Sequence, residues 1–306
     1  MRVISVVNYK GGVGKTTLTA NIAAELAWRG HNVLLMDSDP QCSLTFSLIE
    51  PEYWKENLED TKTMKQFFDA VLDDENDVSL FELITTPEKT NSKLKQGRLD
   101  LICSHLKLLD VDMDLACELF ALGMRKQRKN YLKVYRRIAE GLKELEDTNP
   151  QEYDYIFIDC PPNFNIVTKS SIVASDYILI PAKPDYLSTL GIDYLQRSVN
   201  DLIREYNEYA AGENCEIITP QVLGVVFTMV QFYDSNPIAA QSNYITRTKR
   251  LGMPVFSTYL RENKSLFATN QETGIPVVLN RYSNQGFQNI VTEITELVNE
   301  FESILG

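Results

Sequence analysis

The chain is poor in the residues that build metal clusters and disulfide frameworks. It has only two histidines, His31 and His105, and five widely spaced cysteines with no C-x-x-C pair. An odd number of scattered cysteines predicts reduced thiols in a cytoplasmic protein. The sequence opens on an apolar strand-like run and holds no run of 18 apolar residues, so we expect neither a signal peptide nor a membrane span.

Basic charge is also scarce. The formal net charge is −12 and the pI is about 4.8, which argues against a protein coated in positive charge for nucleic acid. The excess of acidic residues is unevenly distributed, because residues 50–90 hold twelve acidic and four basic side chains. Local basic patches therefore remain possible elsewhere. We expect a variable acidic segment at about 48–95, with an adaptor surface or a solvated insertion as its alternative roles.

Apolar runs predict an α/β fold. VISVV (3–7) and NVLLMD (32–37) are typical of buried parallel strands, and the segment between them reads as a helix that stops at Gly30. Together they form a βαβ unit. We expect a mostly parallel central sheet with helices on both faces, in a single domain spanning 1–306. Further strand candidates are LDLIC (99–103), YDYIFID (153–159), YILIPA (177–182), VLGVVFTMV (222–230), PVFSTYL (254–260) and IPVVL (275–279).

The last 20 residues carry the strongest helical periodicity. Apolar side chains recur with i, i+3, i+4, i+7 spacing from Phe287 to Leu305. A membrane-surface anchor would carry Lys or Arg on the polar face, but this face carries Glu293, Glu296 and Glu300. The pattern therefore favours a helix packed on the sheet.

A glycine-rich turn, VNYKGGVGKTT (7–17), joins the first strand to the first helix. Such a turn can be an ordinary tight connection, but the order of strand, turn, G-K-T-T and helix favours a phosphate loop, whose backbone N–H groups and helix N-terminus attract phosphate. In that loop Lys15 reaches the β- and γ-phosphates and Thr16 ligates Mg²⁺. The expected nucleotide-binding residues are Lys10, Gly11, Gly12, Val13, Gly14, Lys15, Thr16 and Thr17.

The loop departs from the strict pattern G-x-x-x-x-G-K-[ST], since Tyr9 stands where the first glycine belongs. It matches instead the deviant pattern K-G-G-x-G-K-[ST], with Lys10 as an additional lysine. Together with LLMDSDPQ (34–41), YDYIFIDCPP (153–162) and YILIPAKPDYLSTLGIDYL (177–195), the loop resembles the ParA branch of the ParA/MinD ATPases over nearly the whole chain.

The resemblance implies ATP and Mg²⁺ as cofactors and a slow, partner-stimulated hydrolysis of ATP. Two subunits would sandwich two ATP molecules, and Lys10 would reach the partner's nucleotide as a charge supplied in trans. Lys10, Lys15 and Asp39 would be catalytic, with Asp39 positioning the attacking water. Thr16, Asp37 and Asp159 would serve the metal, the two aspartates indirectly.

The family also implies contact with nonspecific DNA. The segment 244–264 carries the expected DNA-binding residues Arg247, Lys249, Arg250, Arg261 and Lys264. Within it, R-E-N-K (261–264) replaces the R-N-V-R of relatives, so one arginine has become lysine and a glutamate has entered. A second basic stretch, Arg125 to Arg137, is equally consistent with DNA contact, a dimer face or solvated surface.

The expected partners are a second copy of the chain with ATP, nonspecific DNA of the nucleoid, and a ParB-like or McdB-like adaptor, with no membrane. A strand at residue 2 leaves no room for a preceding helix-turn-helix, so we expect the short form. The cargo would be a plasmid, a chromosome or a carboxysome-like body. The alternatives are a MinD-like membrane-positioning ATPase, a metabolic P-loop ligase, and a regulator that binds nucleotide without turnover.

Overall fold

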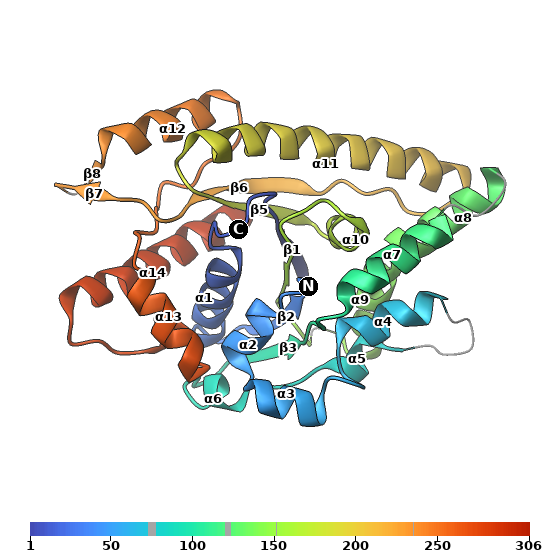
Figure 1. Ribbon diagram of the computed structural model, residues 1–306, viewed down its shortest axis with the longest axis horizontal. Coiled ribbons are helices and arrows are strands. Elements are labelled where there is room, and N and C mark those ends of the chain that lie inside the picture. The colour runs from blue at the N-terminus through green and yellow to red at the C-terminus, as the bar shows by residue number, and fades with distance from the viewer. Residues whose placement is uncertain (73–77, 120–123, 151, 235) are drawn as a thin grey trace.

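A six-stranded, all-parallel sheet forms the centre of the computed structural model, which describes residues 1–72, 78–119, 124–150, 152–234 and 236–306 (Figure 1). The strand order is β3-β2-β4-β1-β5-β6. The strands are β1 (Arg2–Val6), β2 (Asn32–Asp37), β3 (Arg98–Ile102), β4 (Tyr155–Asp159), β5 (Tyr177–Ala182) and β6 (Gln221–Phe227). The predicted α/β class and parallel sheet are confirmed.

The register brings three strand ends to one level. Val6 of β1 pairs with Asp159 of β4 and with Leu179 of β5, and Asp37 of β2 pairs with Asp159. The loop that follows β1 therefore opens where β2 and β4 also end, beside β5, which continues for three more residues to Ala182. In parallel sheets ligands collect at such carboxyl ends, close to the point where the strand order reverses.

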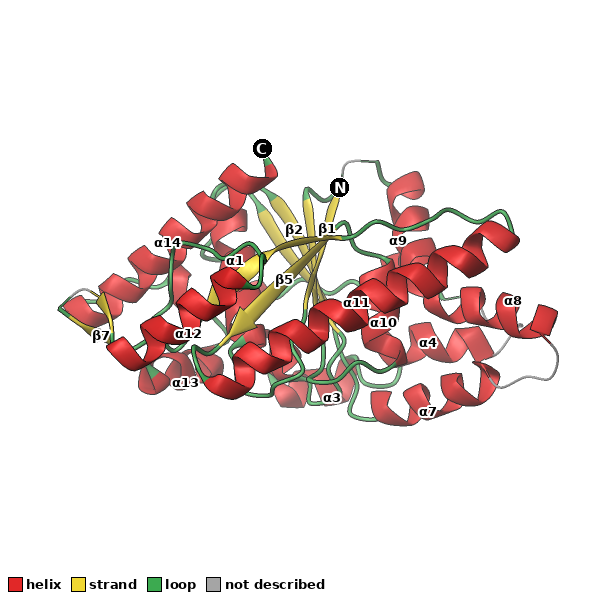
Figure 2. Cartoon of the chain, turned by 90° about the horizontal axis from the view of Figure 1, so that it is seen from above, coloured by secondary structure: helices red, strands yellow, loops and turns green. Residues whose placement is uncertain are grey.

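Helices cover both faces of the sheet, as Figures 1 and 2 show. One face carries α1 (Lys15–Trp28), α2 (Ser43–Leu48), α3 (Pro51–Asn57), α13 (Lys264–Thr273), the 3₁₀ turn η1 (Val277–Leu279) and α14 (Gln285–Leu305). The other carries α4 (Met64–Leu72), α5 (Leu80–Leu83), α7 (Leu108–Leu119), α8 (Met124–Tyr135), α9 (Arg137–Thr148), α10 (Ile166–Val173), α11 (Tyr186–Gly212) and α12 (Ala239–Arg250). Helix α6 (Glu88–Asn91) lies beside β3, and β7 (Phe232–Tyr233) pairs antiparallel with β8 (Asn236–Pro237).

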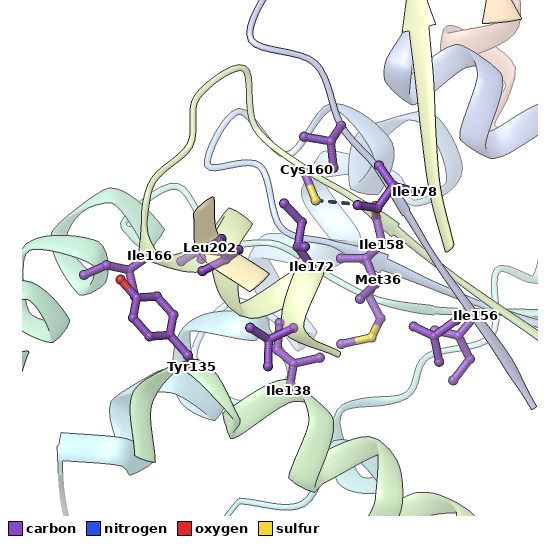
Figure 3. Close-up of a cluster of buried hydrophobic side chains, with 14 of the residues drawn as sticks. Met36, Tyr135, Ile138, Ile156, Ile158, Cys160, Ile166, Ile172, Ile178 and Leu202 are labelled. Carbon is purple, nitrogen blue, oxygen red and sulfur yellow. Dashed lines mark hydrogen bonds between the residues drawn. The ribbon is translucent and has the colours of Figure 1, made fainter. Parts of the chain in front are cut away.

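The sheet is apolar on both sides, so the interior has two cores. Alternate residues of each strand point to opposite faces. Ile4 and Phe157 belong to the core under α1 and α14, whereas Ile156 and Ile158 belong to the core under α9 and α10. Figure 3 shows the second core, in which the buried Cys160 thiol lies 3.7 Å from the Ile158 carbonyl oxygen. The cysteines in the described ranges are free thiols, in agreement with the sequence.

The C-terminal helix α14 packs on the sheet as its periodicity predicts, and the membrane-anchor alternative is wrong for it. Its acidic face is engaged with the protein itself. Glu300 accepts the backbone N–H groups of Ser257 and Thr258 at 2.6 and 3.0 Å, and Glu302 pairs with Arg29 at 2.6 Å. Within the described ranges no helix is long and apolar enough to cross a membrane. The buried residues of α14 are Ile290, Ile294, Leu297, Val298 and Phe301.

Phe301 anchors α14 against β4, because its ring packs on Tyr155 and Phe157 with centroids 5.9 and 5.7 Å apart. Truncating this fully buried ring leaves a cavity, so we expect Phe301→Ala to lower the free energy of unfolding by about 3–5 kcal/mol in urea titrations. Ile304→Ala is the matched control on the same helix, since Ile304 is half exposed. Equal effects of the two substitutions would contradict this packing.

The acidic segment forms helices α3 to α6 over its described part. Two other segments depart from the sequence expectations. Residues 254–260 do not form a regular strand, because only a few backbone hydrogen bonds join them to β6. The Val225 N–H donates to the Pro254 carbonyl, and the Phe256 N–H donates to the Val225 carbonyl. Further on, the Leu260 N–H donates to the Phe227 carbonyl. Proline cannot donate to a ladder, which limits pairing here. Residues 277–279 form a 3₁₀ turn, so the strand expected at 275–279 is wrong.

Candidate active site

The turn between β1 and α1 is shaped by two glycines in the left-handed region. Gly12 has a φ of 66° and Gly14 a φ of 84°, values that other residues adopt only with strain. Gly14 stands at the N-cap and has no side chain to bond the first N–H groups of α1. Those N–H groups stay available for an anion at the positive end of the helix.

Thr228, directly after β6, stabilises this turn through hydrogen bonds. Its hydroxyl donates to the carbonyl of Val13 at 2.7 Å and lies 3.4 Å from the carbonyl of Ala182. A Cβ built on Gly14 would touch Thr228 at 3.7 Å. The phosphate loop is therefore held between helix α1, which follows it, and the residue that follows β6 at the edge of the sheet.

Lys15, the first residue of α1, points back along the loop. Its ammonium donates to the carbonyl of Asn8 at 3.2 Å, and the residue is buried. Burial lowers the pKa of Lys15, and the nearby carboxylates of Asp159 and Asp39 oppose this shift. A buried cation inside a loop with free backbone donors fits a bound polyphosphate.

Thr16 and Asp159 meet as the sequence predicts. The Thr16 hydroxyl donates to Asp159 Oδ2 at 2.6 Å, while Oδ1 of the same carboxylate is buried and has no partner among the described residues. Burial raises the pKa of Asp159 to about 8, and the charge of Asp37 adds to this. An unpartnered buried carboxylate oxygen beside a hydroxyl fits a hard divalent cation such as Mg²⁺.

Asp37 and Asp39 follow β2 in a tight turn. Asp37 is fully buried and accepts three hydrogen bonds, from the Thr45 N–H and hydroxyl at 2.8 and 2.7 Å and from the Asp39 N–H at 3.1 Å. Burial raises the pKa of Asp37 to about 7. Asp39 accepts the Gln41 N–H at 2.9 Å and is also buried, with 8% of its surface exposed. Asp37 thus organises the turn that presents Asp39.

Lys10 does not point into its own loop. Its ammonium donates to Asp185 at 2.6 Å and lies 3.4 Å from the Ser188 hydroxyl, both at the N-terminus of α11. Partial burial raises the pKa of Asp185, but the hydrogen bonds from Lys10 and Ser188 outweigh it and lower that pKa. The side chain of Lys10 is about one-third exposed. It is an accessible cation at the mouth of the loop.

A cavity of about 100 Å³ adjoins the phosphate loop. Its walls include Gly14 and Thr17 of the loop and Met229, which follows β6. Sequence reasoning assigned Gly14 and Thr17 to the nucleotide and Arg261 and Lys264 to DNA, but it did not bring them together, because the walls of this cavity come from distant segments. Its remaining lining residues are Leu18, Thr228, Leu260, Arg261, Glu262, Asn263, Lys264 and Phe267.

The structure divides the predicted DNA-binding residues into two groups. Arg247, Lys249 and Arg250 are exposed in the last turn of α12. Arg261 instead pairs with Glu293 of α14 at 2.5 Å and lines the cavity beside Gly14, and the exposed Lys264 lies 3.6 Å from Glu262. The sequence count of acids near this patch missed Glu293, which lies 32 residues further on.

The second basic stretch is also divided. Arg137 donates to the carbonyls of Phe67 and Val78 and so faces the protein, whereas Arg128 and Lys129 are exposed on α8. The side chains of residues 124–126 lie outside the described part of the structure.

The site and fold match one family. Residues 1–211 match AAA_31, described as an AAA domain. The chain belongs to this family of ParA-type ATPases. The sporulation initiation inhibitor protein Soj of Bacillus subtilis is 30% identical over 206 residues, which cover 67% of this chain and 68% of Soj. The resemblance to the ParA branch is thereby confirmed.

Two solved structures show the same fold as this ParA-type chain. Apo McdA from Cyanothece superposes with a TM-score of 0.71 at 21% identity and covers all of both chains. Cobyrinic acid a,c-diamide synthase from Mycobacterium smegmatis, with bound ADP and magnesium, gives a TM-score of 0.63 at 24% identity, covering 89% of this chain and 91% of that one. At such identities the likeness concerns the fold alone.

Proposed function

We propose that this ParA-type ATPase forms an ATP-dependent sandwich dimer that binds nonspecific DNA and positions a cargo in the cytoplasm through adaptor-stimulated hydrolysis. The observation that carries this proposal is the placement of Lys10. A lysine in the phosphate loop would normally be expected to serve its own nucleotide, yet this one extends outward to Asp185. An accessible cation at the mouth of the site is placed to serve the nucleotide of a second subunit.

The surface around Lys10 supports a second subunit at this place. Tyr9 contacts Phe164 and Tyr194 with ring centroids 5.7 and 5.3 Å apart, so an aromatic rim borders the loop. Exposed apolar side chains of this kind mark interaction surfaces. The large exposed apolar residues of α11, of α7 and of the segment entering α7 are Leu106, Leu109, Met113, Tyr186, Leu187, Leu190 and Tyr194.

Within one subunit the roles divide by position. The N–H groups from Gly11 to Thr17 and the Lys15 ammonium would hold the β- and γ-phosphates. Thr16 would ligate Mg²⁺ and Asp159 would hold it indirectly, and the metal, when bound, would supply positive charge to the transferring phosphoryl group. Asp39 would orient the attacking water, and Asp37, which accepts the Asp39 N–H, would support the magnesium shell through water. The cavity beside Gly14 and Met229 is placed to receive the base.

DNA contact is proposed for the exposed end of α12. Arg247, Lys249 and Arg250 present three cations, and each phosphate contact adds about one to the salt slope of binding. We expect the triple alanine variant to weaken binding of an ATP-loaded dimer to a random-sequence duplex at least about tenfold and to lower the salt slope by about three. Fluorescence polarisation over a salt series measures both.

The control for this prediction is Arg197→Ala with Arg204→Ala, since both arginines are exposed on α11 beside aspartates. The comparison includes apo, ADP and ATP states and Asp39→Ala with ATP, which should trap the dimer. Loss of binding in Lys10→Ala would support the DNA-tethered switch. An ATP-dependent dimer that binds no DNA in any state would contradict it, and would direct attention to a membrane or a purely protein surface.

A metabolic ligase is the second candidate, because the fold is shared with cobyrinic acid a,c-diamide synthase. A ligase would hydrolyse ATP only with its small-molecule substrate present. Turnover that rises with DNA and an adaptor, and needs no small molecule, would separate the positioning ATPase from it. The adaptor would be ParB-like or McdB-like, and the cargo a plasmid, a chromosome or a carboxysome-like body.

A further inference from the structure

The turn that presents Asp39 is held from outside by Ser104, two residues beyond the end of β3. The buried Ser104 hydroxyl donates to the backbone carbonyl of Asp39 at 2.7 Å. The same carbonyl accepts the Cys42 N–H at 2.9 Å from within the turn. The Asp39 carbonyl is therefore fixed from two directions, and only one of them belongs to its own loop.

Every backbone polar group of Ser104 also has a partner. Its N–H donates to the hydroxyl of Thr45 at 2.9 Å, and that hydroxyl donates to Asp37 Oδ2 at 2.7 Å. Its carbonyl accepts the indole N–H of Trp54 at 3.3 Å. Ser104 thus joins Asp37 and Asp39, the two aspartates of the turn after β2, to helix α3.

Trp54, at the α3 end of this chain of hydrogen bonds, is held in place by packing. Its side chain is 3% exposed and packs edge-on against Phe46 of α2 at 5.4 Å and beside His105 at 5.8 Å. Helix α3 belongs to the acidic segment, whose role the sequence did not explain. Ser104 links helix α3 and the Asp39 turn directly, because its carbonyl accepts the Trp54 indole N–H and its hydroxyl donates to the Asp39 carbonyl.

We propose that Ser104 is a positioning residue for Asp39, and that Trp54 couples helix α3 of the acidic segment to ATP hydrolysis through it. This inference rests on the proposed role of Asp39 in orienting the attacking water. A loosened Asp39 turn would still let the phosphate loop bind ATP, because the loop shares no hydrogen bond with Ser104 in the described contacts. Hydrolysis would suffer, since it depends on the alignment of the water.

Ser104→Ala is expected to lower kcat about tenfold while KM and the affinity for ATP change less than about twofold, because misplacing a positioning group affects the reaction step more than binding. Ser170→Ala is the matched control. Ser170 is equally buried and donates to the carbonyl of Tyr135 on another element, at 3.2 Å, on the face of the sheet away from α2 and α3. Its kcat is expected to stay within about twofold of wild type.

Trp54 supplies a second readout that a purely structural role would leave unchanged. The chain has two tryptophans, so Trp28→Phe leaves Trp54 as the only one. We expect saturating ATP to change the Trp54 emission in this background, and Ser104→Ala to abolish the change. Trp54→Phe removes the indole N–H but keeps an aromatic ring, and should lower kcat about threefold.

Unchanged kcat in Ser104→Ala, together with an intact Trp54 response, would overturn the proposal. If Ser104→Ala does not fold by circular dichroism, Trp54→Phe decides, and wild-type kcat in that variant overturns it. Asp39→Ala in the same assay separates the two proposals. Hydrolysis by Asp39→Ala at the wild-type rate would refute the role of Asp39, whereas its loss beside an active Ser104→Ala would refute only the positioning link.

Discussion

Replacing Lys15 with alanine is expected to weaken ATP binding at least about 100-fold, because a buried charge aimed at phosphate is worth several kcal/mol in a site of low dielectric. Lys15 is buried at the start of α1 and faces Asp39 and Asp159. Without it, a polyanionic nucleotide would meet these carboxylates with no opposing ammonium at that position. Titration of a fluorescent ATP analogue against the protein measures the change.

Lys143→Ala provides the matched control for Lys15→Ala. Lys143 is an exposed lysine of α9, on the far face of the sheet from the phosphate loop. We expect its ATP affinity to equal that of wild type. Binding by Lys15→Ala within about threefold of wild type would show that the turn is not a phosphate loop of the kind described.

Lys10→Ala is expected to leave ATP binding within about threefold of wild type and to lower hydrolysis by about 10³-fold, as removal of a catalytic cation supplied in trans does elsewhere. The reason is geometric. The Lys10 ammonium bonds to Asp185, and only the backbone N–H of Lys10 bonds within the loop, to Asn8, so loss of the side chain spares the pocket of its own subunit. Steady-state hydrolysis and analytical ultracentrifugation with ATP measure turnover and dimer formation.

Mixing two inactive variants tests whether Lys10 acts across the dimer. In a heterodimer of Lys10→Ala and Asp39→Ala, the site with an intact Asp39 receives Lys10 from its partner. Random 1:1 mixing should then restore about one quarter of wild-type activity, since half of the dimers carry one complete site out of two. No recovery in stable mixed dimers would show that Lys10 acts within its own subunit.

The phosphate loop could be predicted from the sequence because its residues are contiguous in the chain and form a recognisable pattern. The glycines, Lys15 and Thr16 lie between one strand and one helix. Asp159 joins them because parallel strands end at a common edge, and the register of β1 with β4 fixes that meeting. The phosphate-loop pattern and the predicted parallel sheet were together sufficient to predict that Thr16 and Asp159 meet.

The contacts that hold the site could not be predicted, because they join residues far apart in the chain. Lys10 and Asp185 are 175 positions apart, and Val13 and Thr228 are 215 apart. The sequence predicts Arg261 to be a cation available to DNA, but in the structure it forms an ion pair with Glu293 of α14. A composition count over a short window misses such partners. Likewise, residues 254–260 have strand-like composition, but their pairing depends on Pro254 and on the path of β6.

The order of strands in the sheet has a consequence for how the protein is made. β1 precedes the other strands of the sheet in the chain, yet its register partners start at Tyr155 and Tyr177. Such long sequence separations slow folding, since the chain between them must be closed before the strands can pair. The brace from Thr228 to Val13 comes later still. During translation the phosphate loop therefore lacks its sheet neighbours until residues 155–182 have been made, and it lacks its brace until Thr228, at about three quarters of the 306 residues, has followed.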